Sequence, residues 1–204
     1  MRLLETMRAE GGRVALLDLH LARLAASAAA LGFLVDAEAV RQRVAEAVAS
    51  APPLAAVRLT LGARGDVSVE TRALADAPLR TAWIDPEPLA EAGGPLCRHK
   101  TTARAHYERR RRRAGARGGD EALLLNARGE VTEGTRTNVW AETDGRLWTP
   151  PLASGGLAGV QRTHVLATRP DAGERALTPD DLRAAEAVYL SNALRGWMPV
   201  RLVG

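Results

Sequence analysis

The sequence predicts a mixed α/β protein with two lobes, and two observations support this prediction. Up to residue 70, short strand-like runs flank two alanine- and valine-rich stretches with helical spacing, which predicts the element order ββααββ. After the segment 75–78 (Ala-Asp-Ala-Pro), further strand-like runs alternate with shorter helical stretches and glycine-containing turns. We therefore predict a small α/β lobe over residues 1–77 and a larger lobe over residues 78–204.

The first lobe is expected to begin with a β-hairpin, because Gly11 and Gly12 separate two short apolar runs. Asp18 is the expected N-cap of the first helix, which ends at Gly32, and Asp36 is expected to open the second helix. The predicted elements are strands 1–8 and 13–17, helices 19–31 and 36–50, and strands 56–62 and 66–70.

In the second lobe, helix starts are marked by glycine, threonine and proline. The glycine-rich turn 154–159 leads into one helix, and Thr178 is the expected N-cap of another, with Pro179 at its first position. The predicted elements are strand 80–84, helix 101–113, strands 121–125, 130–133, 137–141 and 145–149, helix 160–167, a helix start at 178–182, and strands 187–191 and 197–202.

The composition excludes several classes of protein. Hydrophobic residues make up 46% of the chain but aromatic residues only 3%, so the core is expected to be aliphatic. No apolar run reaches the roughly 18–20 residues that span a bilayer, and the N-terminus is too charged for a signal peptide. A single cysteine, Cys97, excludes an internal disulfide and a multi-cysteine metal site. We expect a soluble cytoplasmic protein with no membrane partner.

The net charge of +4 raises the question of nucleic-acid binding. The basic excess is concentrated in five consecutive arginines, Arg109 to Arg113, but no aromatic platform or zinc-finger motif accompanies them. A solvated helix face therefore explains the run better than a nucleic-acid patch. We expect no nucleic-acid partner and keep an arginine-rich nucleic-acid-binding protein as a remote alternative.

Lys100 is the only lysine among 28 basic residues. Arginine remains protonated in proteins and cannot form an imine, whereas a lysine can be tuned to a neutral nucleophile. A second chemical signal is the glycine-rich turn that enters a helix at Gly159, because the free N–H groups and dipole of a helix start bind anions. Neither signal alone defines a reaction.

Five sequence motifs occur together in order along the chain. They are His20-Leu21-Ala22-Arg23-Leu24, Lys100, Glu133-Gly134-Thr135-Arg136-Thr137-Asn138, Thr149-Pro150-Pro151-Leu152 and Gly159-Val160-Gln161-Arg162. In this order they resemble the class IV aminotransferase family, the fold type IV pyridoxal-phosphate (PLP) enzymes, over nearly the whole chain. The resemblance implies a small N-terminal α/β lobe and a larger, β-barrel-like C-terminal lobe with helices.

The resemblance also implies a role for each motif. Lys100 would be the catalytic residue that carries PLP covalently, and Glu133 would face the pyridine nitrogen of the cofactor. Arg23 and the helix start at Gly159 would bind the phosphate. His20 is expected to be structural. The implied cofactor-binding residues are Arg23, Lys100, Glu133, Asn138, Gly159, Val160, Gln161 and Asn192.

Within the family, the stretch Ser191-Asn192-Ala193-Leu194 followed by Pro199 and Val200 looks like the version found in 4-amino-4-deoxychorismate lyases. The chain is similar to the lyase domain that some bacteria fuse to aminodeoxychorismate synthase component I. The implied reaction yields 4-aminobenzoate, a folate precursor, and pyruvate. A branched-chain or D-amino-acid aminotransferase is the alternative.

The resemblance further implies a homodimer and a functional pairing with aminodeoxychorismate synthase. Candidate residues for substrate binding are Thr6, Arg8 and Arg58. Family members usually carry a further segment before the strand that begins here at Met1. The resemblance therefore implies either a compact variant or a start that has been assigned late.

Overall fold

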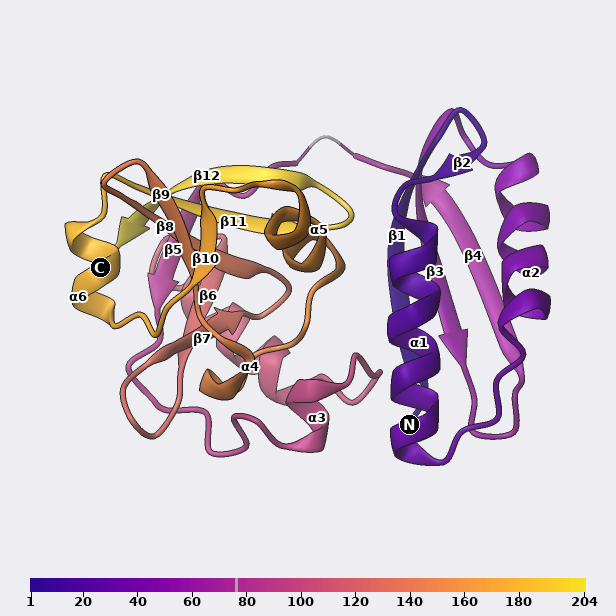
Figure 1. Ribbon diagram of the computed structural model, residues 1–204, viewed down its shortest axis with the longest axis horizontal. Helices are drawn as coiled ribbons and strands as arrows, with labels where there is room; N and C mark the ends of the chain where they lie inside the picture. The colour runs from indigo at the N-terminus through magenta and orange to yellow at the C-terminus, as the bar shows by residue number, and fades with distance from the viewer. Residues whose placement is uncertain (76) are drawn as a thin grey trace. The chain divides into compact units, whose positions relative to one another are not determined.

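The computed structural model describes residues 1–75 and 77–204, which form two compact units (Figure 1). The first unit comprises Met1–Ala77 together with His99–Ala103, and the second comprises Pro78–Arg98 and Arg104–Gly204. Asp76, in the middle of the predicted boundary segment, lies outside the described residues.

The observed division differs from the predicted one in the placement of the lysine segment. The prediction assigned His99–Ala103 to the second lobe, but this segment belongs to the first unit. The reason is its hydrogen bonding to the first strand: the Leu4 N–H donates to the Lys100 carbonyl oxygen at 2.9 Å, and the Thr102 N–H donates to the Arg2 carbonyl oxygen at 2.9 Å. Such long-range backbone pairing leaves no mark in the local sequence pattern.

The first unit confirms the predicted order ββααββ. Its elements are β1 (Leu3–Glu10), β2 (Arg13–Val14), α1 (Leu17–Leu31), α2 (Ala37–Ala49), β3 (Leu54–Leu61) and β4 (Val67–Ala73), and its antiparallel sheet has the order β2-β1-β3-β4. Asp36 caps α2 as predicted, accepting hydrogen bonds from two backbone N–H groups. The prediction that Asp18 caps α1 is wrong, because α1 begins at Leu17, which places Asp18 in its first turn, and its N-cap is Leu16 in a left-handed conformation.

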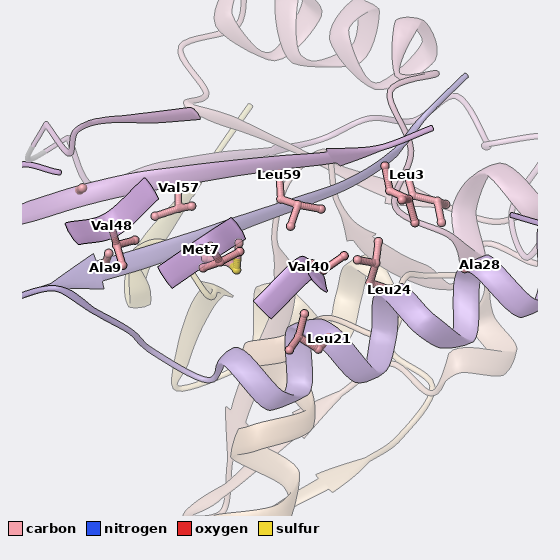
Figure 2. Packing of buried hydrophobic residues seen from close by; sticks show 13 residues of the cluster. Leu3, Met7, Ala9, Leu21, Leu24, Ala28, Val40, Val48, Val57 and Leu59 are labelled. Carbon is pink, nitrogen blue, oxygen red and sulfur yellow. The ribbon is translucent and has the colours of Figure 1, made fainter. Parts of the chain in front are cut away.

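The core of the first unit is aliphatic, as the composition predicted. Alternate residues of β1, including Leu3 and Met7, pack against α1 and α2 through Leu24 and Val40 (Figure 2). Because side chains alternate along a strand, the residues between them on β1 point to the opposite face of the sheet. The two helices therefore cover only one face of this sheet.

The second unit is built around a curled eight-stranded sheet that forms a half-barrel (Figure 1). The strand order is β10-β9-β8-β11-β12-β5-β6-β7, and the pairs β10–β9, β12–β5 and β5–β6 are parallel. The strands are β5 (Thr81–Ile84), β6 (Glu121–Leu125), β7 (Val131–Gly134), β8 (Asn138–Thr143), β9 (Arg146–Thr149), β10 (Ala172–Glu174), β11 (Ala187–Asn192) and β12 (Gly196–Val203). The predicted α/β fold class, with a small lobe and a larger barrel-like lobe, is confirmed.

The helices of the second unit match the predicted ones with some changes. They are α3 (Pro95–Arg98), α4 (Ala105–Gly115), the 3₁₀ turn η1 (Leu152–Ser154), α5 (Val160–Thr168) and α6 (Pro179–Ala184). Thr178 caps α6 in a complete capping box, as predicted. The helix predicted from Thr101 begins only at Ala105, because the preceding segment is extended beside β1. In the described part of the chain, no helix is long and apolar enough to cross a membrane.

Candidate active site

The segment that carries Lys100 is held in the first unit by hydrogen bonds to residues 2–4 at the start of the chain. Besides the bond from Leu4, the segment forms a β-bridge between Leu3 and Thr101, and the Arg2 N–H donates to Thr102 Oγ1 at 3.0 Å. The neighbouring His99 places its Nδ1 3.1 Å from Ser27 Oγ of α1. The lysine side chain is therefore carried on a short extended segment with a fixed backbone.

Arg23 of α1 lies in a buried cluster with two other charged or titratable residues. Its Nε donates to Glu5 Oε1 at 2.8 Å and its Nη2 donates to Glu5 Oε2 at 2.5 Å. His20 Nδ1 lies 2.6 Å from the same Oε2. Burial raises the pKa of the Glu5 carboxyl, but Arg23 and His20 outweigh this effect and lower that pKa to about 2. His20 thus has the structural position that the sequence predicted.

Glu5 was not singled out from the sequence, although a signal was present. It occurs on β1 between Leu3 and Met7, on the face that packs against the helices, where a carboxylate is unexpected without a partner. Glu5 lies on β1 close to the attachments of both Arg23 and Lys100. It fixes the Arg23 guanidinium, and its neighbour Leu4 holds the backbone of Lys100.

The three candidate substrate residues share the other face of the same sheet. Thr6 and Arg8 alternate with the core residues of β1, and Thr6 is paired in register with Arg58 of β3. Arg8 Nη2 lies 3.1 Å from Glu10 Oε2, so this guanidinium has a carboxylate partner at the surface. The structure brings these residues onto one face, opposite to Glu5, and their role in substrate binding stays a prediction.

Glu133 is buried at the end of β7 in the second unit, with 5% of its surface exposed. The Tyr107 hydroxyl donates to Glu133 Oε1 at 2.7 Å, and the Leu157 N–H donates to Oε2 at 3.1 Å. Burial, together with the nearby Glu133 carboxylate, raises the pKa of Tyr107 far above its ordinary value. Tyr107 therefore stays a neutral hydrogen-bond donor. Tyr107, on α4, was missed from the sequence because no local pattern links it to a residue 26 positions later.

The glycine-rich turn reaches the start of α5 in close contact with β7 and β8. Gly159 is the N-cap of α5, and a Cβ atom placed on it would lie 1.8 Å from Asn138 Oδ1. Asn138 Nδ2 donates to the Leu157 carbonyl oxygen at 3.0 Å, so the amide holds the turn in place. Val160 and Gln161 follow as the first two residues of the helix, whose N–H groups at this end have no acceptor within the helix. The arrangement has the form of an anion-binding helix start.

A second buried carboxylate, Glu121, fixes the turn that follows Glu133. It is fully buried and accepts hydrogen bonds from the N–H groups of Thr135 at 3.0 Å and Arg136 at 3.2 Å, and from Thr137 Oγ1 at 3.2 Å. Burial raises the pKa of Glu121 despite these donors. The sequence showed only a glutamate at the head of an apolar strand, and we did not identify this role from it.

Asn192 has a structural explanation in the turn between β11 and β12. Its Oδ1 accepts hydrogen bonds from the N–H groups of Leu194 at 3.1 Å and Arg195 at 2.8 Å, and its Nδ2 donates to the Arg136 carbonyl oxygen at 3.3 Å. The amide therefore stabilises this turn and ties it to the β7–β8 connection. The contact of Asn192 with the cofactor stays a prediction.

The arginine run on α4 is largely engaged in ion pairs. Arg110 is buried, with its Nη1 3.1 Å from Asp85 Oδ2, and it also donates to the Glu87 carbonyl oxygen at 2.6 Å. Arg113 pairs with the same two acidic residues, and Arg111 pairs with Glu108 at 3.0 Å. These contacts make much of the run part of the unit's own structure. Among residues 1–75 and 77–204, no group of three side chains is arranged to hold a metal ion.

The second unit thus carries a curled sheet, a glycine-led helix start and a buried carboxylate. The first unit, taken by itself, carries an anchored arginine and the single lysine. The chain belongs to the class IV aminotransferase family: the model of that family, described as amino-transferase class IV, matches residues 2–203. Members of this family are PLP-dependent enzymes. The resemblance predicted from the motifs is confirmed.

Individual relatives include both lyases and aminotransferases. A Schizosaccharomyces pombe protein, provisionally named an aminodeoxychorismate lyase, is 34% identical over 194 residues, which is 90% of this chain and 82% of that protein. A crystal structure from Mesorhizobium loti, provisionally described as an amino-acid aminotransferase, has a TM-score of 0.90 and 38% identity and covers 99% of both chains. The 4-amino-4-deoxychorismate lyase of Pseudomonas aeruginosa has a TM-score of 0.84 at 26% identity, covering 98% of this chain and 82% of that one.

Proposed function

We propose that this protein is a PLP-dependent lyase that converts 4-amino-4-deoxychorismate to 4-aminobenzoate and pyruvate. The observation that carries the proposal is the likeness, over nine-tenths of the chain, to the S. pombe protein provisionally named an aminodeoxychorismate lyase, together with the five motifs of the family resemblance. The lyase-like stretch at Ser191 to Leu194 supports it further. The product is a precursor of folate.

The residues of the chain fit the cofactor. PLP needs a lysine amine, a carboxylate for its ring nitrogen and donors for its phosphate. Lys100 supplies the amine, and Glu133 is a buried carboxylate that accepts two hydrogen bonds. The start of α5 has backbone N–H groups without acceptors in the helix, which can bind an anion, and Gly159 there lets Asn138 approach closely, since a Cβ would collide with its amide.

Each of these residues has a task in the proposed reaction. Lys100 Nζ would hold the cofactor and, as a free amine, would accept the proton from the substrate carbon that bears nitrogen. When bound, PLP supplies the electron sink for the negative charge left on that carbon. Glu133 would keep a proton on the ring nitrogen. By the family resemblance, Arg23 and the α5 residues Gly159, Val160 and Gln161 would each contribute to binding the phosphate. The bond from the ring to the enolpyruvyl oxygen would then break, and Lys100 Nζ would return the proton to the departing group, which leaves as pyruvate. This loss is favoured because the remaining ring becomes aromatic.

A class IV aminotransferase is the second candidate, supported by the likeness to the M. loti structure. It would share the first proton removal but would also need to return an amino group to a keto acid.

The lyase and the aminotransferase are distinguished by supplying 4-amino-4-deoxychorismate and measuring 4-aminobenzoate and pyruvate. Formation of both products at equal amounts is the result we expect. Exchange of nitrogen between an amino acid and 2-oxoglutarate, without these products, would favour the second candidate.

We also propose that the enzyme works as a homodimer and in functional pairing with aminodeoxychorismate synthase. The family resemblance supports both. Light scattering of the purified protein tests the first, with twice the mass of the 21.7 kDa chain as the expected result. A coupled assay, in which the synthase generates the substrate in the same vessel, tests the second.

A further inference from the structure

The hydroxyl group of Tyr107 is held in place from several sides. The Arg104 guanidinium carbon lies 4.6 Å from the centre of the tyrosine ring, and the His106 ring centre lies 4.1 Å from it. The fully buried Cys97 belongs to the same core cluster as the tyrosine. Only 4% of the tyrosine surface is exposed. Its hydroxyl therefore has one fixed direction, toward Glu133 Oε1 at 2.7 Å.

The second oxygen of the same carboxylate is fixed from another part of the chain. Leu157, in the glycine-rich turn before α5, donates its N–H to Glu133 Oε2 at 3.1 Å. A carboxylate with one donor on each oxygen cannot rotate about its last bond without losing a hydrogen bond. The plane of the carboxylate is therefore defined by these two donors. A hydrogen bond to an ionised group also favours its ionised form over the neutral one.

We propose that Tyr107 is a positioning residue that fixes the Glu133 carboxylate, ionised and in one plane, for the ring nitrogen of the cofactor. The inference rests on the proposed PLP chemistry and adds a residue that the family motifs in this sequence do not include. Tyr107 acts through Glu133 and need not touch the cofactor itself. Removing its hydroxyl takes away the hydrogen bond to Oε1, so that the carboxylate is less firmly held for the ring nitrogen.

The chain offers a matched control for this hydroxyl. Tyr189, on β11, also donates to a glutamate, with its hydroxyl 2.7 Å from Glu142 Oε2, and neither member of this pair is a residue proposed to bind the cofactor. Tyr107→Phe and Tyr189→Phe therefore delete the same kind of hydrogen bond at the same length. The two tyrosines are the only ones in the chain.

The experiment is a titration of purified wild type and both variants with PLP, read by the visible absorbance of the bound chromophore and by its change with pH. We expect Tyr107→Phe to weaken PLP binding about tenfold, the order expected for loss of one hydrogen bond to a charged group, and to shift the pH at which the visible band changes. Tyr189→Phe should match the wild type in both readouts. A melting curve for each variant checks that it is folded.

A double-variant comparison keeps the test independent of general destabilisation. If Tyr107 acts through Glu133, then Tyr107→Phe should have little additional effect on PLP affinity in a Glu133→Gln background. The inference would be overturned if Tyr107→Phe bound PLP as tightly as the wild type with an unchanged pH profile. It would also be overturned if the effects of the two substitutions on PLP affinity were fully additive. Either result would leave the proposed function standing. A wild-type protein that binds no PLP would overturn both.

Discussion

Glu5 and Arg23 form a largely buried ion pair in the small unit. Two guanidinium nitrogens of Arg23 reach the carboxylate, at 2.8 Å and 2.5 Å, and only 3% of the Glu5 side chain is exposed. The arginine proposed to bind the cofactor phosphate is thus held by a carboxylate from the strand beneath it. The strand that carries Glu5 also binds the backbone of Lys100 through Leu4. Changes at Glu5 should therefore affect both stability and cofactor affinity.

Glu5→Gln should lower the free energy of unfolding by about 3 kcal/mol, because it leaves a buried guanidinium without its counter-charge. Urea unfolding at pH 7 measures this loss. Glu10→Gln, at the exposed end of the same strand, is the control and should change the stability little, since exposed ion pairs contribute little. If both variants lost the same free energy of unfolding, the buried Glu5 cluster would contribute no more to stability than the exposed ion pair.

The same carboxylate predicts a dependence of stability on pH. The pKa of Glu5 is about 2 in the folded protein, against an ordinary value of 4.5. Because the pKa of Glu5 is lower in the folded protein than in the unfolded chain, the ionised carboxylate stabilises the fold fully at pH values above its unfolded-state pKa, at about pH 5 and higher. This stabilisation is lost progressively as the pH falls toward 2. The difference in unfolding free energy between wild type and Glu5→Gln should therefore shrink between pH 5 and about pH 2.5, and a constant difference would contradict the assigned direction.

Gly159→Ala should weaken PLP binding by about tenfold or more, because the new methyl group would overlap the Asn138 amide and displace the turn before α5. Titration with PLP measures the change. The double variant Gly159→Ala/Asn138→Ala makes room for the methyl group. Its affinity should recover relative to Gly159→Ala alone if the overlap is the cause. No recovery would mean that the glycine is needed for another reason.

Glu121→Ala should lower the unfolding free energy by about 3 kcal/mol, since it removes the acceptor of several buried donors in the turn at residues 135–137. It should also weaken PLP binding, because this turn directly follows Glu133. Glu108→Ala, on the exposed face of α4, removes a carboxylate from the same unit as a control. If Glu121→Ala keeps wild-type stability, the turn is held by its backbone pairing instead.

Much of the fold could be predicted because its signals are local. The caps at Asp36 and Thr178 and the double glycine at Gly11 and Gly12 are short-range features, and each appears in the structure where it was predicted. Asp18 was assigned as a cap because cap residues are recognised by type. The chain instead turns at Leu16 in a left-handed conformation, which a leucine rarely adopts.

The candidate site could be predicted only in part, because its supporting residues are distant in sequence. The motifs indicated Lys100, Arg23 and Glu133, but not the partners that orient them. Glu5 lies 18 positions from Arg23, and Tyr107 lies 26 positions from Glu133. These pairings depend on which strand and helix faces meet, and one sequence does not show that.

The central claim is that Lys100 carries the cofactor, and reduction of the purified protein with borohydride followed by mass spectrometry of its peptides tests it most directly. Because the chain has a single lysine, the expected result is unambiguous: a yellow protein with one pyridoxyl group per chain, attached at Lys100, and no such label in Lys100→Ala. A wild-type protein that stays colourless after incubation with PLP, or a label that persists in Lys100→Ala, would contradict the account.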